Sequence, residues 1–218
     1  TAGTISGLGN EAVTITGTSS AAADLNAINT ATTGVVTVNS TTITGSAADV
    51  KTAYDADTAG TIAGLGDEAV TISDTTIGAG LLITLDAHTT GLINAASVTT
   101  LTGTAAEIIH LLIGTGFQGI VGLGDEDITL MGTTTVAQFN TIAASTTGVI
   151  TATISEGDMS SLNAITETGN ALTLTITDAS VAASNLNTLD DKTIVAIDAA
   201  AVTTLFGSAS DLNTAYSA

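Results

Sequence analysis

Apolar and polar residues alternate over many short stretches of the chain, and this pattern predicts β-strands. In Val13–Thr16 and Val70–Ser73, β-branched aliphatic residues alternate with Thr or Ser, which is the period of two expected of a strand with one buried face. Ile and Val are therefore expected to face inward and Thr outward. Further strands are predicted directly after the Thr-Thr-Gly phrases, at Val35–Val38, Leu92–Ala95 and Val149–Ala152.

Between these strands the pattern changes to that of short helices. Apolar residues three positions apart form one inward stripe, in Leu25–Ile28, Phe139–Ile142, Leu162–Ile165, Leu186–Leu189 and Leu212–Ala215. Capping boxes, in which a hydroxyl residue precedes a carboxylate by three positions, predict the start of three helices, at Ser46/Asp49, Thr104/Glu107 and Ser208/Asp211. A glycine in the left-handed conformation is expected to end helices, at Gly34, Gly91 and Gly148.

One asparagine recurs at the same position of these helical stretches. Its side-chain amides are expected to form a ladder from helix to helix, as repeated Asn does in cross-β structures. The residues are Asn26, Asn140, Asn163, Asn187 and Asn213.

The phrase Gly-Leu-Gly-x-Glu occurs three times, at 7–11, 64–68 and 122–126. Strand-and-turn phrases ending at Gly45, Asp74, Gly103 and Gly132 recur at half that interval. Because such repeats bury their apolar face only against neighbouring repeats, the sequence predicts one array over residues 1–218. Its long copies are approximately 1–57, 58–115, 116–173 and a partial 174–218. The predicted fold is a mainly β repeat protein: a right-handed parallel β-solenoid of about eight strand–short helix–strand coils, roughly 27–29 residues per coil.

Composition narrows the classes of function. The chain has 44% hydrophobic but only 2% aromatic residues and contains no Pro or Cys, so a thin aliphatic core without disulfides or thiolate chemistry is expected. Its 21 acidic residues against Lys51 and Lys192 give a net charge of −19, which excludes nucleic acid as an expected partner. No apolar run approaches the roughly 18 residues that a membrane span requires, so membrane insertion is not expected.

The acidic residues of the Gly-Leu-Gly-x-Glu phrases are the candidate metal ligands. Asp67, Glu68, Asp125 and Glu126 stand beside glycines, and carboxylates in such loops can bind calcium. The alternative is an acidic, solvated turn without a ligand. No other cofactor is expected. Neither His88 nor His110 has an evident catalytic partner and no nucleophile motif occurs, so the chain is predicted not to be an enzyme.

Three phrases of the sequence carry a family resemblance. Gly45–Tyr54, Gly64–Ile72 and Leu186–Asp190 resemble the tandem repeats of very large, acidic, cysteine-free cell-surface or secreted proteins of marine bacteria, especially picocyanobacteria. The resemblance covers essentially the whole chain, and a weaker likeness exists to the TAAELN-type repeats of phage tail fibres. The resemblance implies an extracellular or cell-surface location and a structural or adhesive role, and it carries no catalytic residues.

The two ends of the chain match an internal stretch. Tyr216–Ala218 resembles Tyr54–Ala56, and Thr1–Ile5 repeats Thr58–Ile62. Either the chain is a segment of a longer array, or copies stack head to tail through exposed strand edges. The predicted partner is therefore the chain itself, end to end, or flanking repeats. The residues predicted to take part are Thr4, Ile5, Leu205, Leu212 and Tyr216.

Together these patterns predict an extracellular structural protein, either a filament subunit or a repeat of a surface protein. The alternative is a binding module for calcium, glycans or an ice surface. The ice hypothesis rests on an outward row of threonines, whose companion row is interrupted by Met131 and Phe206. The row is Thr14, Thr42, Thr71, Thr100, Thr129, Thr153, Thr175 and Thr204.

Overall fold

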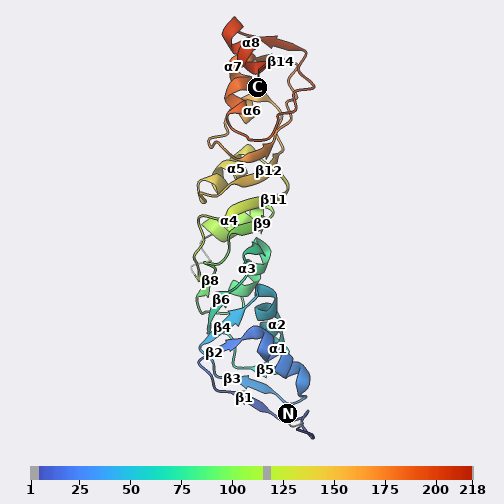
Figure 1. Ribbon diagram of the computed structural model, residues 1–218, viewed down its shortest axis with the longest axis vertical. Coiled ribbons are helices and arrows are strands. Elements are labelled where there is room, and N and C mark those ends of the chain that lie inside the picture. The colour runs from blue at the N-terminus through green and yellow to red at the C-terminus, as the bar shows by residue number, and fades with distance from the viewer. Residues whose placement is uncertain (1–4, 115–118, 218) are drawn as a thin grey trace. The chain divides into compact units, whose positions relative to one another are not determined.

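The computed structural model describes residues 5–114 and 119–217. Figure 1 labels the helices and strands of the described chain. This chain divides into two compact units. Unit 1 takes the described parts of Thr1–Thr99 and Thr115–Leu123, and unit 2 those of Thr100–Gly114 and Gly124–Ala218.

Unit 1 combines short parallel strands with three helices in its described part. Two sheets have the strand orders β1-β3-β5 and β10-β8-β6-β4-β2. The helices are α1 (Ala22–Ala31), α2 (Ala47–Thr58) and α3 (Ala79–Asp86). The strands are β1 (Val13–Ile15), β2 (Ser19–Ala21), β3 (Val36–Val38), β4 (Thr42–Gly45), β5 (Ile62–Ala63), β6 (Ala69–Ile72), β7 (Thr76–Gly78), β8 (Ile93–Asn94) and β10 (Ile120–Val121).

Unit 2 has the same mixture of elements. Strands β9 (Thr100–Gly103), β11 (Asp127–Thr134), β12 (Ile150–Ile154) and β13 (Ala171–Thr173) pair in that order, all parallel. Strand β14 (Ser180–Ala182) pairs in parallel with β15 (Thr204–Phe206). The described helices are α4 (Ala105–Ile113), α5 (Val136–Ala143), α6 (Met159–Leu162), α7 (Ala183–Asp190) and α8 (Ala209–Ala215).

The core of each unit is a column of aliphatic residues aligned across paired strands. In unit 1, Ile43 pairs with Val70 and Val70 with Ile93. In unit 2, Ile128 stands between its partners Leu101 and Ile150. All of these side chains are buried. Alternating faces therefore put Ile, Val and Leu inward, as the period-two pattern predicts.

The prediction of a mainly β parallel solenoid is wrong. The structure is α/β, because its described helices together span more residues than its strands, and the strands belong to several separate parallel sheets flanked by helices. The uniform spacing of 27–29 residues is also wrong. Paired residues lie between 20 and 27 positions apart, as in Thr151 with Ala171 and Thr42 with Ala69. The physical reason is that the helices between the strands differ in length, from four residues in α6 to 12 in α2, so the strands that they connect are unequally spaced. The helix predicted over Leu162–Ile165 is also misplaced, because α6 ends at Leu162.

The predicted N-caps are present at all three helices. The hydroxyls of Ser46, Thr104 and Ser208 each accept a hydrogen bond from the backbone N–H three residues on. The reciprocal bond of a full capping box forms at Thr104, where Glu107 accepts from the Thr104 N–H at 2.8 Å. At Ser46 the shorter Asp49 instead accepts from the serine hydroxyl at 2.7 Å. The extra methylene group of glutamate thus lets its carboxylate reach the N-cap N–H and complete the capping box.

The Glu107 cap makes stability depend on pH. Hydrogen bonds from the Thr104 N–H and hydroxyl hold the pKa of Glu107 below its ordinary value. A carboxyl with a lowered folded-state pKa contributes stability above its unfolded pKa, and this contribution is lost as pH falls through the folded value. We expect the melting temperature of the wild type to fall more steeply than that of Glu107→Gln between about pH 5 and pH 3. Parallel curves from thermal melts monitored by circular dichroism would contradict this reading.

The asparagines do not form the predicted ladder. Asn26 Nδ2 donates to the main-chain carbonyl of Asp49, and Asn187 Nδ2 to that of Asp211, both at 3.0 Å. Asn140 Nδ2 donates to the carbonyl of Ala164 at 2.8 Å. These three amides therefore bond the backbone of a later helical segment and not the amide of another asparagine.

The predicted threonine row is out of register as well. Thr14 lies in a different sheet from Thr42. Thr42 pairs with Ala69, and Thr100 with Asp127. A regular hydroxyl lattice over the predicted residues is therefore absent from the described strands.

Of the helices in the described chain, none combines the length and apolar character needed to cross a membrane.

Candidate functional site

The three Gly-Leu-Gly-x-Glu phrases form loops that are held by their own glutamates. The N–H of Gly66 donates to Glu68 Oε2 at 2.8 Å, and the N–H of Gly124 to Glu126 Oε2 at 2.8 Å. In the first copy the N–H of Gly9 donates to Glu11 Oε2 at 2.7 Å. Each carboxylate thus satisfies a main-chain donor within its own turn.

A threonine from a later segment bonds the backbone of each glutamate. Thr89 Oγ1 donates to the Glu68 carbonyl at 3.0 Å and accepts from the Gly91 N–H at 2.9 Å. The same pair of bonds recurs in the other copies. We call these the Glu–Thr–Gly sites: Glu11/Thr32/Gly34, Glu68/Thr89/Gly91 and Glu126/Thr146/Gly148.

Glycine is required at these sites because two backbones meet there. A Cβ at Gly91 would lie 2.1 Å from the Glu68 carbonyl oxygen, and a Cβ at Gly34 or Gly148 would lie 2.2 Å from the Glu carbonyl of its site. The prediction of a left-handed residue is wrong at all three, since none of them has a positive φ. Lack of space, and not conformational freedom, selects the glycine.

Two of the three glutamates are buried. Glu68 is 2% exposed and Glu126 is fully buried, whereas Glu11 is half-buried. The Gly9 N–H lowers the pKa of Glu11, so this carboxylate remains ionised at neutral pH. The prediction of a solvated acidic turn therefore describes only the aspartates, Asp67 and Asp125, which are exposed.

Tyr54 of α2 adds a donor to the second site. Its hydroxyl lies 3.2 Å from Glu68 Oε2, and burial raises the pKa of this phenol, so it remains a hydrogen-bond donor. The Tyr54 ring stacks on His88, with centroids 5.9 Å apart. His88 Nε2 lies 3.7 Å from Asp55 Oδ1, and Asp55 also pairs with Lys51 at 2.6 Å. These contacts fix the end of α2 against the loop.

The third site lacks this donor. Leu112 stands 14 residues before Glu126, as Tyr54 stands before Glu68. Among the described residues, Glu126 Oε1 is buried without a hydrogen-bond partner. Of the three Glu–Thr–Gly sites, the second therefore has a tyrosine donor and the third has a leucine at the equivalent position.

We expect Tyr54→Phe to lower the free energy of unfolding by about 1 to 2 kcal/mol, because Glu68 loses a donor in a buried position. The loss should not unfold the protein, because the third site forms with Leu112 at the position equivalent to Tyr54. Urea denaturation measures the change, and Thr175→Ala, which changes an exposed side chain outside this site, is the control. A loss of equal size in the control would refute the assigned role of the Tyr54 hydroxyl.

The predicted calcium ligands do not converge. Exposed Asp67 and Asp125 each precede a buried glutamate whose Oε2 accepts a hydrogen bond from a main-chain N–H group. Over residues 5–114 and 119–217, no three acidic or histidine side chains gather in a group that could hold a metal ion. Calcium binding by these residues stays a prediction.

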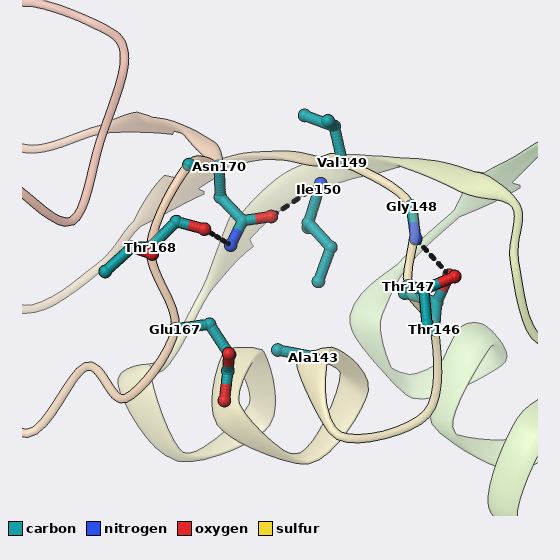
Figure 2. Close-up of a pocket in the computed structure, with 10 residues that line it drawn as sticks. Ala143, Thr146, Thr147, Gly148, Val149, Ile150, Glu167, Thr168 and Asn170 are labelled. Atoms are coloured by element: carbon teal, nitrogen blue, oxygen red, sulfur yellow. Dashed lines mark hydrogen bonds between the residues drawn. The ribbon is translucent and has the colours of Figure 1, made fainter.

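A cleft of about 360 Å³ lies in unit 2 beside the third site (Figure 2). Its walls come from the end of α5 with the segment that follows it, and from residues 167–170. In unit 1 the N–H groups of Val36 and Ile93 donate to the main-chain oxygens of Thr61 and Gly119. In this cleft the corresponding N–H, that of Ile150, donates instead to the side chain of Asn170, at 2.8 Å.

The polar groups of this cleft are largely used by the fold. The Asn170 amide lies between Ile150 and Thr168 and bonds both (Figure 2). Thr146 is held by Glu126 and Gly148. Sequence reasoning missed Asn170. The sequence did contain a signal for Asn170, since an amide residue stands there at a position where the other strands begin with an aliphatic residue.

The residues predicted at the assembly ends are partly exposed. Ile5 and Tyr216 are 80% and 82% exposed, and Leu205 and Leu212 are half-buried. Thr4 lies outside the described residues.

Comparison with known proteins adds no relative: no protein family, no curated protein and no solved structure matches the chain.

Proposed function

We propose that the chain is a structural, non-enzymatic element of an extracellular or cell-surface array, joined through its terminal segments to copies of itself or to flanking repeats. The observation that carries this proposal is the recurrence of the Glu–Thr–Gly sites. At three places the chain uses its most distinctive acidic residue to bind its own main chain. A residue repeated for internal bonding supports a role in building a regular structure.

Charge and composition support the same proposal. A net charge of −19 keeps such a protein soluble and opposes nonspecific association. The absence of cysteine from the sequence fits an extracellular setting, since no thiol is present to oxidise. The resemblance to the repeats of giant marine bacterial surface proteins points in the same direction.

Thermal unfolding of a two-copy chain tests the proposal. Two copies of residues 1–218 are joined by a single aspartate, which reproduces the spacing around Asp57 between Tyr54 and Ile62. An array element should unfold at a higher temperature in this tandem chain than as a single copy, because the junction covers apolar side chains of both copies. The control is the tandem chain with Leu212→Lys in its first copy only. Equal melting temperatures for the single copy and the unmodified tandem chain would refute the proposal.

A further inference from the structure

The chain contains an internal junction that resembles what its two ends would form together. Helix α2 is followed by β5, whose Ile62 is fully buried and pairs with Val36 of β3. Strand β5 packs against α2. Six residues further on, Glu68 accepts the hydrogen bond from Tyr54. This junction is held by one buried isoleucine and one tyrosine–carboxylate bond.

The same residues stand at the ends of the chain, but they are uncovered there. Ile5 occupies the position of Ile62 in the first copy, and Tyr216 that of Tyr54 after the last N-cap. Ile5 is 80% exposed where Ile62 is fully buried, and Tyr216 is 82% exposed where Tyr54 is 2% exposed. The contrast identifies two apolar side chains whose internal counterparts are covered by another segment.

We call the surface formed by Thr193, Ile197 and α8 the C-terminal face. It resembles the part of the internal junction that β3 contributes. Thr193 donates to the Leu172 carbonyl and accepts from the Val195 N–H, as the threonines of the Glu–Thr–Gly sites do. Four residues after such a threonine stands the aliphatic residue that pairs with the next strand. This residue is Val36 in the first site, and it is Ile197 after Thr193.

Two adjoining hollows lie beside Ile197. They measure about 240 and 290 Å³ and share Leu186, Ala199 and Ala215 in their walls. The second also reaches Leu205 and Tyr216. Helix α8 buries none of its residues, whereas α2 buries four. The apolar wall that receives Ile62 in the interior is therefore present here without an occupant among the described residues.

We propose that this C-terminal face binds the N-terminal segment of a second copy, with Ile5 of that copy against Ile197 and α8 and with Tyr216 donating a hydrogen bond to the Glu11 carboxylate of that copy. The inference rests on the proposed function and names the contacts of its self-association. The register follows from the interior, since 14 residues separate Tyr54 from Glu68 and eight separate it from Ile62.

Glu11 is suited to accept this bond. Its Oε2 already binds the N–H groups of Gly9 and Asn10, at 2.7 and 3.2 Å, in the way that Glu68 Oε2 binds Gly66 while it also accepts from Tyr54. The bonds within the described chain leave room for one further donor. A second copy is the favoured occupant because its terminal phrase repeats the internal one that the fold already buries.

Mixing two variants, each blocked at one end, tests this head-to-tail contact. Ile5→Lys places a charge on the inserted segment, and Leu212→Lys places one on the receiving helix. Each variant alone should be a monomer in sedimentation velocity, whereas their equimolar mixture should form a dimer and nothing larger, because one intact face of each kind remains. The wild type should form longer species. Circular dichroism verifies that both variants fold, and Tyr216→Ala replaces Leu212→Lys if α8 is lost.

A second pair of variants tests the hydrogen bond itself. Tyr216→Phe and Glu11→Gln should each weaken wild-type association by about tenfold, and the double variant should be little weaker than either single one. Ser217→Ala is the control and should associate as the wild type does. Independent, additive losses would overturn the Tyr216–Glu11 contact.

Three other results would overturn the inference. These are a monomeric wild type at about 100 μM, a concentration at which a weak specific contact is populated, dimers formed by either blocked variant alone, and a mixture that remains monomeric. A monomeric wild type together with a stabilised tandem chain would leave the proposed function intact and show that flanking repeats, not free copies, occupy the face.

Discussion

Replacing Leu162 by aspartate is expected to lower the free energy of unfolding by about 3 to 5 kcal/mol, because a carboxylate without a partner would be buried. Leu162 is fully buried in α6. Leu186 lies on the corresponding stripe of α7 but is half-buried beside the terminal hollow. Leu186→Asp should therefore cost less than Leu162→Asp, since its charge can reach water.

Thr175→Ala is the surface control for this pair. The side chain of Thr175 is exposed, and its loss should change stability by no more than about 0.5 kcal/mol. Guanidinium denaturation of the three variants gives the ranking directly. If the two leucine substitutions have equal effects, or if the control is as damaging as either, the assignment of buried and exposed faces in unit 2 is incorrect.

Gly148→Ala should be strongly destabilising for so small a change, with a loss of about 2 to 3 kcal/mol. The added Cβ would lie 2.2 Å from the Glu126 carbonyl oxygen and 2.6 Å from the Asp127 nitrogen. Both are main-chain atoms, so no side-chain rotation relieves the contact. The segments must separate, which also breaks the bonds of Thr146 to Glu126 and Gly148.

Gly17→Ala provides the matched control, because its Cβ would meet its nearest atom, the Ser19 carbonyl oxygen, at 3.3 Å. A shift of a few tenths of an ångström accommodates that contact, and the alanine gains stability by restricting the unfolded chain. Urea melts should show a large loss for Gly148→Ala and a change of less than about 1 kcal/mol for Gly17→Ala. Similar melts for both would contradict the close approach at the third site.

Local patterns in the sequence were sufficient to predict strand faces and the starts of the three helices that have a predicted N-cap. The alternation around Val70 and the hydroxyls of Ser46 and Thr104 act over a few residues, so their outcome needs no knowledge of distant contacts. The overall class was not predictable in the same way. Helix α1 runs for 10 residues around the much shorter apolar stripe Leu25–Ile28, and such extensions make the protein α/β.

The candidate site failed for a related reason. An acidic residue beside glycines looks solvated or metal-binding in the sequence, yet Glu68 and Glu126 are buried because segments 20 or 21 residues away close over them. A usable signal was present. Each Gly-Leu-Gly-x-Glu phrase is followed 20 or 21 residues after its glutamate by a threonine that stands two residues before a glycine, and this recurrence could have linked the two phrases.

The most direct test of the account is amide hydrogen exchange at Gly66 and Gly124, measured by NMR with and without calcium. Our central claim is that the glutamates of the repeated phrase bind the main chain and serve the structure. It predicts slow exchange at both amides, because each is bonded to a buried carboxylate, and no change on addition of calcium at matched ionic strength. Rapid exchange at these amides, or protection that depends on calcium, would contradict the claim.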